Sequence, residues 1–325
     1  MAEAEPDPLE VTLRASGLTV RPVPRLERPS AGEIEELFTR RRRPAILTGM
    51  IEDWPARTDW TPQKLIERHG GKTVTALMGL PADGVLMPDR QSAYERTLTF
   101  ASFVETMLTT TTAKPCYLAY TRVADILPSG DYDFTTLLGR AHDDTGDTRA
   151  WIGSAGTRSM FHSDLKDNLF CQIWGRKHVV LLPWEHSMAA YPFPDNLVNS
   201  QVDLAEVDLG RFPRLREAPL LAATMDPGDV LFMPRGCWHD IRSRSPSISL
   251  NHWFGEPMGF ADYAGLLTRL GPRYWSATLR DFFRYGVLGQ PQRADFFFTP
   301  APTGKRLYDL VRHGNFSKDN NPADR

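Results

Sequence analysis

The chain has 325 residues, of which 41% are hydrophobic and 24% charged, a composition typical of an ordinary globular protein with one large or two small domains. Its formal net charge of −2 gives no drive toward nucleic acid or anionic membranes, so neither is expected as a partner. We expect a cytoplasmic protein with reduced thiols, because no apolar run is long enough to span a membrane, the N-terminus lacks a signal-peptide core, and the three cysteines form no paired motif.

The first third of the chain is predicted to alternate helices with single strands. Residues 1–20 open on an acidic, Pro-containing stretch, and we expect them to be flexible. Ser30 to Glu33 match a capping box ahead of apolar residues at helical spacing. That helix ends near the arginine run 40–43, which is more typical of a solvated helix end than of a nucleic-acid patch. The other elements predicted here are helices at 61–70 and 100–108, the latter capped by Thr99, and strands at 45–48, 72–78 and 116–120.

Short strands separated by turns are predicted from about residue 150 to 255. Segments 169–174 and 177–182 flank Gly175-Arg176, which predicts a hairpin. Asp226 to Asp229 form a turn signal ahead of an apolar strand, with His239 expected at the end of that strand. Residues 247–254 alternate and predict a further strand. Many short strands with regular turns favour a sandwich or a barrel.

The pattern turns helical after the strands. Residues 258–313 are predicted to be a helical region with two amphipathic, aromatic-rich segments, 260–267 and 274–285. Such helices expose apolar surface unless they pack on the barrel or on a partner. Residues 314–325 are polar and are expected to form a flexible tail. Residues 21–257 are then the main domain.

His162, Asp164 and His239 are the candidate metal ligands. His162 and Asp164 are two residues apart, so they point to the same side of an extended strand. Two imidazoles and one carboxylate form the facial triad that leaves open positions on a non-haem Fe(II). A cosubstrate and O2 bind at such positions, so the pattern indicates an oxygenase.

A second pair, His142 and Asp144, has the same spacing. It lies in a polar, loop-like stretch without a strand pattern, which favours a solvated loop. Metal binding by this pair is the competing interpretation.

Lys177 is the candidate cosubstrate residue. A lysine inside an apolar strand is costly unless it meets an anion, and the distal carboxylate of 2-oxoglutarate supplies one. The alternative is that Lys177 lies on the solvent face of its strand. Hydrogen-bonding residues surround the motif, each more typical of a structural role when taken alone: Tyr117, Ser159, Asn168 and Asn251.

Three stretches together resemble the JmjC-type, cupin-like Fe(II)- and 2-oxoglutarate-dependent oxygenases. They are residues 159–177, 228–239 and 251–253, and the early stretch around Pro44 to Gly49 and Asp53 to Pro55 also looks like this family. The likeness is strongest to the small hydroxylase branch that includes the asparaginyl hydroxylase acting on hypoxia-inducible factor.

The resemblance implies a mainly β fold, a double-stranded β-helix or jelly roll with flanking N-terminal and C-terminal helices. It implies Fe(II) and O2 at His162, Asp164 and His239, which would be the catalytic centre. It implies 2-oxoglutarate on Lys177, assisted by Tyr117 and Ser159. Asn168 and Asn251 would line the cosubstrate pocket. Several family members form homodimers through C-terminal helices, which would account for the aromatic stripe in 260–285.

The main functional expectation is hydroxylation of a C–H bond on a peptide or protein side chain. Two alternatives stay open: hydroxylation of a small molecule such as a natural product or a nucleoside, and a catalytically silent metal-binding cupin module. Demethylation is less expected, because the chain lacks obvious reader or zinc modules. The insert from Trp184 to Ala223 lies between the ligand motifs and would be placed to cover the site, with 191–194 either an aromatic lid or a surface loop.

Overall fold

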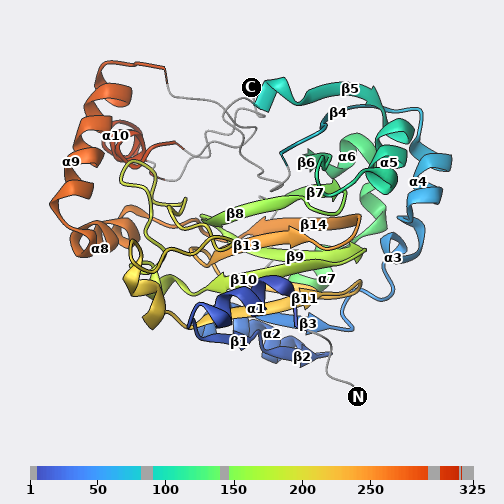
Figure 1. The fold of residues 1–325 in the computed structure, drawn as a ribbon, viewed down its shortest axis with the longest axis horizontal. Coiled ribbons are helices and arrows are strands. Elements are labelled where there is room, and N and C mark those ends of the chain that lie inside the picture. Colours follow the sequence, from blue (N-terminus) through green and yellow to red (C-terminus); the bar gives the residue numbers. More distant parts are fainter. Residues whose placement is uncertain (1–5, 82–90, 140–145, 292–300, 315, 317–325) are drawn as a thin grey trace.

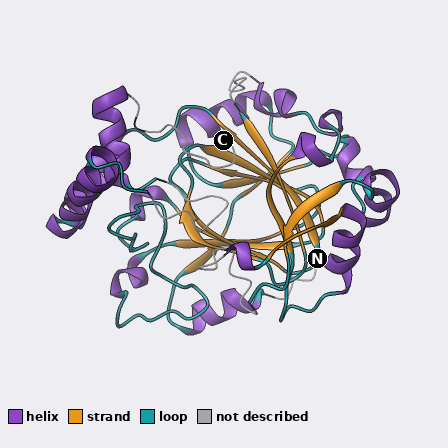
Figure 2. Ribbon diagram, turned by 90° about the horizontal axis from the view of Figure 1, so that it is seen from above, coloured by secondary structure: helices purple, strands orange, loops and turns teal. Residues whose placement is uncertain are grey.

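The computed structural model describes residues 6–81, 91–139, 146–291, 301–314 and 316. Two β-sheets form the centre of the protein, and helices lie around the strands (Figures 1 and 2). The predicted fold class, a mainly β jelly roll with flanking helices, is confirmed. No helix in the described ranges is long and apolar enough to cross a membrane.

The smaller sheet has five strands. Its first strand runs parallel to its neighbour, and the other pairs are antiparallel. In spatial order the strands are β1 (Val20–Pro22), β11 (Leu220–Met225), β10 (Lys177–Leu182), β13 (Trp238–Ser243) and β8 (Arg158–Ser163).

The larger sheet has nine strands. It is antiparallel except for the pair β2 and β3 at one edge. In spatial order the strands are β2 (Arg25–Glu27), β3 (Ala45–Thr48), β12 (Val230–Met233), β9 (Asp167–Trp174), β14 (Ser247–Phe254), β7 (Asp147–Gly153), β6 (Tyr117–Arg122), β4 (Thr73–Leu77) and β5 (Glu95–Thr99).

The predicted hairpin between 169–174 and 177–182 is wrong. The two strands exist as β9 and β10, but β9 belongs to the larger sheet and β10 to the smaller one. The chain crosses between the sheets at Gly175, which has φ +71°. A jelly roll passes from one sheet to the other at such corners, so strands adjacent in sequence need not pair.

Both faces of β9 and β10 are buried, as expected for strands that lie between a filled interior and a covered outer face. On β9, Phe170 packs in the cluster between the sheets, whereas Leu169 and Cys171 pack in the cluster beneath the helices. On β10, Val179 and Leu181 point into the interior. The two-residue period of a strand therefore tells which side chains reach the interior.

Helices cover the outer faces and one end of the sheets. The capping box of Ser30 and Glu33 is present, and the Thr61 and Thr99 side chains cap the next predicted helices. The helices are α1 (Pro8–Ala15), α2 (Ala31–Glu36) with the π-helical turn Leu37–Arg41, α3 (Pro55–Asp59), α4 (Pro62–His69), α5 (Phe100–Thr109), α6 (Val123–Ile126), α7 (Phe134–Leu138), α8 (Phe260–Leu270), α9 (Pro272–Asp281) with the π-helical turn Phe282–Val287, and α10 (Thr303–His313).

The expectation that residues 1–20 are flexible is wrong for 8–15, which form α1. Leu9 and Leu13 of this helix are buried against the outer face of the smaller sheet. Asp7 caps the helix through the Leu9 N–H at 2.8 Å and forms an ion pair with the Arg244 guanidinium. A short helix gains stability from such tertiary contacts, which a local pattern does not reveal.

The C-terminal helices α8, α9 and α10 lie within the predicted helical region 258–313. Of the predicted tail, the structure describes only Gly314 and Phe316. Phe316 is buried, and its ring lies 5.3 Å from the ring of Tyr263 on α8. The three cysteines are free and buried, as predicted.

We predict that Gly175→Ala lowers the free energy of unfolding by about 2 to 4 kcal/mol, since strain and overpacking combine there. A Cβ at Gly175 would lie 2.0 Å from the Pro246 carbonyl oxygen, at a φ that side chains rarely adopt. Gly32→Ala in α2 is the control, because a Cβ there contacts nothing within 4 Å, and we expect it to stabilise slightly. Urea denaturation measures the free energy of unfolding of both variants. Equal denaturation midpoints would contradict the close approach of Gly175 to Pro246.

Candidate metal centre

His162, Asp164 and His239 come together on the pair of strands β8 and β13. His162 and His239 are direct cross-strand partners, and their ring centroids are 4.1 Å apart. Asp164 follows the end of β8, where its carbonyl oxygen accepts a hydrogen bond from the Gly236 N–H at 2.8 Å. The strand pair therefore sets the positions of both imidazoles before any metal binds.

The position expected for His239 needs a correction. It is the second residue of β13 and does not end the strand that begins at residue 230. That strand, β12, stops at Met233, because Pro234 and Gly236, with φ +80°, form a turn that carries the chain into the smaller sheet.

The three side chains point their donor atoms at a common position. His162 Nε2 lies 3.9 Å from one carboxylate oxygen of Asp164, and His239 Nε2 lies 3.8 Å from the other. All three ligand atoms lie within 4.8 Å of one another. Two imidazole nitrogens and one carboxylate suit Fe(II) and leave part of its coordination sphere free.

Each imidazole is held by a backbone carbonyl. The ring nitrogen Nδ1 of His162 lies 2.6 Å from the Met160 oxygen, and Nδ1 of His239 lies 3.0 Å from the Cys237 oxygen. A protonated Nδ1 donates to the carbonyl, which leaves the lone pair of Nε2 for a metal. Burial, reinforced by the neighbouring His162, lowers the pKa of His239 to about 4, so this ring is neutral near pH 7.

Side chains of the larger sheet orient the Asp164 carboxylate, which follows β8 of the smaller sheet. Asp164 Oδ2 accepts hydrogen bonds from Asn168 Nδ2 on β9 at 2.9 Å and from Trp253 Nε1 on β14 at 2.8 Å. Asn251 donates to Asn168 Oδ1 at 3.1 Å. Asn168 and Asn251 thus orient a candidate ligand, and the cosubstrate contacts predicted for them stay a prediction.

Trp253 was not among the site residues identified from the sequence. The available signal was the two-residue period of its strand. Asn251 and Trp253 are two apart, so both point to the interior, while Leu250 and Phe254 point outward into the other core cluster.

Lys177 lies inside the protein, so the solvent-face alternative is wrong. It is in phase with Val179 and Leu181 on β10 and is only 2% exposed. Its ammonium group lies 5.4 Å from the centre of the Phe170 ring and 5.7 Å from that of Tyr117. Burial lowers its pKa to about 7. Within the described ranges no carboxylate forms an ion pair with Lys177, so a bound anion would supply the missing counter-charge.

Tyr117 and Ser159 lie in the same interior. Tyr117 on β6 and Ser159 on β8 are both buried. Burial raises the pKa of the Tyr117 phenol, so it stays protonated and able to donate a hydrogen bond.

The competing pair His142 and Asp144 lies outside the described residues.

The insert after β10 docks beside the metal ligands. The Ser163 N–H donates to the Val198 oxygen at 2.8 Å, and Asn199 forms an isolated bridge with His162. Tyr191 packs on Phe212, with ring centroids 5.0 Å apart, and its hydroxyl accepts from the Arg214 N–H at 3.0 Å. Tyr191 is therefore an anchor of the insert.

Comparison with known proteins gives one family for most of the chain. The model of the cupin-like domain family matches residues 31–260. Lysine-specific demethylase 8 of Danio rerio is 30% identical over 241 residues, which cover 71% of this chain and 58% of the relative. The protein of the same name from Xenopus tropicalis is 29% identical over 238 residues, covering 71% and 52%. HSPB1-associated protein 1 of Rattus norvegicus is 30% identical over 250 residues, covering 67% and 50%. The chain spans about half the length of these relatives.

We predict that Trp253→Phe weakens binding of Mn(II), a stand-in for Fe(II), by about 10- to 100-fold, because Asp164 loses a hydrogen bond that orients it. Isothermal titration measures the affinity. Trp275→Phe, in the C-terminal helical cluster, is the matched control and should bind as the wild type does. Equal affinities for the two variants would show that the indole N–H has no role at the metal.

Proposed function

The chain belongs to the JmjC-type, cupin-like domain family, and we propose that it is an Fe(II)- and 2-oxoglutarate-dependent oxygenase that hydroxylates a C–H bond. One observation carries the proposal: a cluster of two histidines and one aspartate shares an interior with a buried lysine that forms an ion pair with none of the described carboxylates. The triad fits the iron and the lysine fits the far end of a dicarboxylate.

Fe(II) would be held by His162, Asp164 and His239, and when bound it supplies the oxidising chemistry with O2 and 2-oxoglutarate. The protein's own residues supply positioning. The carbonyls of Met160 and Cys237 keep both Nε2 atoms free of protons. Asn168 and Trp253 hold the carboxylate of Asp164 in one orientation.

The spacing along the strands suits 2-oxoglutarate. Leu181 pairs with His239, and Lys177 lies four residues from Leu181 on the same interior face. Four residues of a strand span about 13 Å, which the lysine side chain and a five-carbon dicarboxylate would fill together. Tyr117 and Ser159 would donate hydrogen bonds to the distal carboxylate beside Lys177. Apolar side chains such as Phe170 and Ile241 would keep water away.

A peptide or protein side chain is the proposed substrate. The names of two relatives support a protein target, since one is a lysine-specific demethylase and the other is associated with HSPB1. Hydroxylation of a carbon is the common step, because demethylation of an N-methyl group also begins by oxidising a C–H bond. Hydroxylation of a small molecule and a silent metal-binding module are the alternatives, and the succinate assay tests the second of them.

We also propose that the protein forms a homodimer through its C-terminal helices. Four apolar side chains of α9, the π-helical turn after it and the residue that caps this turn are between 50% and 68% exposed: Leu279, Phe283, Val287 and Leu288. Such a stripe is costly in water, and a second copy of the same stripe would cover it.

Phe283→Glu should convert the dimer to a monomer, because it places a charge at the centre of the apolar stripe. Light scattering coupled to gel filtration measures the mass. Arg269→Glu on α8, outside the stripe, is the control and should leave the mass unchanged. A wild-type protein that is monomeric at all concentrations would refute the dimer.

The oxygenase assay measures succinate formed from 2-oxoglutarate with Fe(II), ascorbate and O2. His162→Ala should abolish succinate, because the metal loses one of three ligands. Lys177→Met should raise the KM for 2-oxoglutarate at least about 30-fold, the effect expected when a buried charged partner is lost. Succinate that is unchanged in His162→Ala would contradict the proposed centre. No succinate from the wild type, together with no spectral band for an anaerobic Fe(II)–2-oxoglutarate complex, would favour the silent module.

A further inference from the structure

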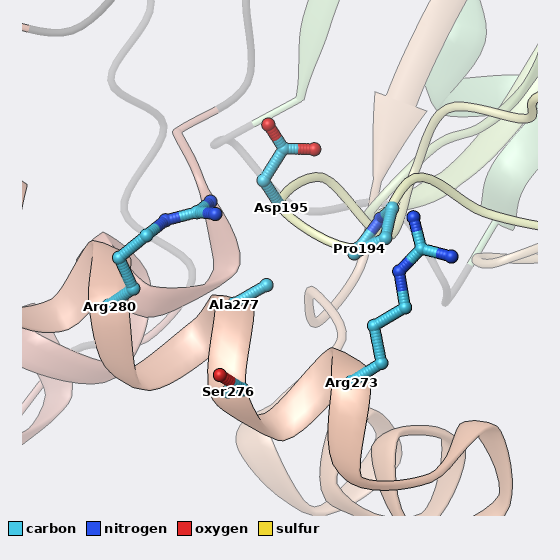
Figure 3. Close-up of a pocket in the computed structure, with 6 residues that line it drawn as sticks. All are labelled: Pro194, Asp195, Arg273, Ser276, Ala277 and Arg280. Carbon is cyan, nitrogen blue, oxygen red and sulfur yellow. The ribbon is translucent and has the colours of Figure 1, made fainter.

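A polar cleft lies between the insert and the C-terminal helices. It has a volume of about 360 Å³ and is lined by two residues of the insert and four of α9 (Figure 3). The lining residues are Pro194, Asp195, Arg273, Ser276, Ala277 and Arg280. Figure 3 shows the two arginines rising from α9 on either side of Asp195, above Ser276 and Ala277. None of these residues belongs to the metal centre.

The two arginines have unused hydrogen-bonding capacity. In the part of the chain that the structure describes, Arg273 has no carboxylate within ion-pair distance. Arg280 uses Nε for Asp281, at 2.8 Å, and its terminal nitrogens bind no other described group. Among the described residues that line the cleft, Asp195 is the one carboxylate, and Asp281, which does not line it, is the ion-pair partner of Arg280. Arg273 and the terminal nitrogens of Arg280 therefore leave several N–H donors at the cleft that no described group uses, and such donors suit carboxylates.

Isolated bridges and hydrogen bonds connect the cleft to β8, which carries His162. Its insert side belongs to a small hairpin in which Pro192 bridges Ser200 and the Phe193 N–H donates to the Asn199 oxygen at 2.9 Å. Asn199 itself bridges His162. The other side is fixed by the Tyr274 hydroxyl, which donates to the Pro192 oxygen at 2.9 Å.

This connection bounds the distance from the Asp195 backbone in the cleft to the His162 backbone on β8. Asp195 is four residues from Asn199, so their Cα atoms are at most about 14 Å apart. Paired strands add about 5 Å to reach His162. An extended peptide rises about 3.3 Å per residue, so about six residues would span the distance.

We infer that this cleft binds an acidic segment of the protein substrate, within about six residues of the side chain that is oxidised. The inference rests on the proposed function and names the substrate class as a protein with acidic residues near its target. The arginines are assigned a binding role only, because none of the cleft residues belongs to the His162, Asp164 and His239 cluster.

The alternative polyanion is nucleic acid, and the charge distribution disfavours it. The whole chain has a net charge of −2, and the cleft offers two cations beside one carboxylate. A nucleic-acid site needs a longer basic track to neutralise successive phosphates. One or two glutamates or aspartates match two arginines.

The test is direct binding of a fluorescein-labelled hexaglutamate peptide to the full chain, measured by fluorescence anisotropy. Arg273→Gln and Arg280→Gln should each raise the Kd about three- to fivefold, the range for exposed ion pairs. Asp195→Asn should lower it by a similar factor, because the competing carboxylate is gone. Arg269→Gln, an exposed arginine on α8, is the matched control and should leave the Kd unchanged.

Several outcomes would overturn the inference. The first is that hexaglutamate binds no more tightly than a neutral Gly-Ser peptide. The second is that the cleft variants and the wild type bind hexaglutamate with equal Kd values. The third is that a thymidine oligonucleotide with six phosphates binds more tightly than hexaglutamate. Melting curves identify any variant that fails to fold, and Arg273→Gln, which breaks no described ion pair, keeps the test valid if Arg280→Gln unfolds. Because binding needs no turnover, a protein that binds the peptide but forms neither succinate nor the anaerobic Fe(II)–2-oxoglutarate complex would refute the proposed function and leave the cleft assignment standing.

Discussion

The pairing of β8 with β13 is the constraint on which the site depends. It sets His162 opposite His239, and a register irregularity between His239 and Ile241 follows directly after that pair. A β-bulge re-aims side chains and is common beside active sites. Everything else at the site is placed relative to this pair: β10 lies against β13 and brings Lys177, and the insert lies against β8.

The two sheets contribute different residues to the candidate metal centre. The smaller sheet supplies both histidines and the lysine, whereas the larger sheet supplies the donors that orient Asp164 and the ring of Tyr117 beside Lys177. The interior is apolar where Phe170 and Ile241 pack and polar toward the ligands. A change in the distance between the sheets would therefore alter the orientation of the carboxylate before it altered the histidines.

Local signals in the sequence were sufficient for most elements and for the three candidate ligands. The capping box at Ser30 and the spacing of His162 and Asp164 each specify a structure within a few residues. The hairpin and the N-terminal helix were mispredicted because their outcome depends on distant partners. Two consecutive strands with both faces apolar fit a jelly-roll corner as well as a hairpin, and only the sheet assignment distinguishes them. The period of β14 places Trp253 on the interior face, but its hydrogen bond to Asp164 depends on the same long-range information.

The ion pair between Asp7 and Arg244 joins residues 237 positions apart, and β1 pairs with β11 over a similar separation. On a ribosome that adds about 5 to 20 residues per second, the N-terminal segment emerges roughly 10 to 50 s before its partners exist. Its apolar residues must remain without their final contacts for that time. Packing of the N-terminal segment onto the smaller sheet is therefore a late event in biosynthesis. Until then the apolar residues of this segment are accessible to chaperones on the nascent chain.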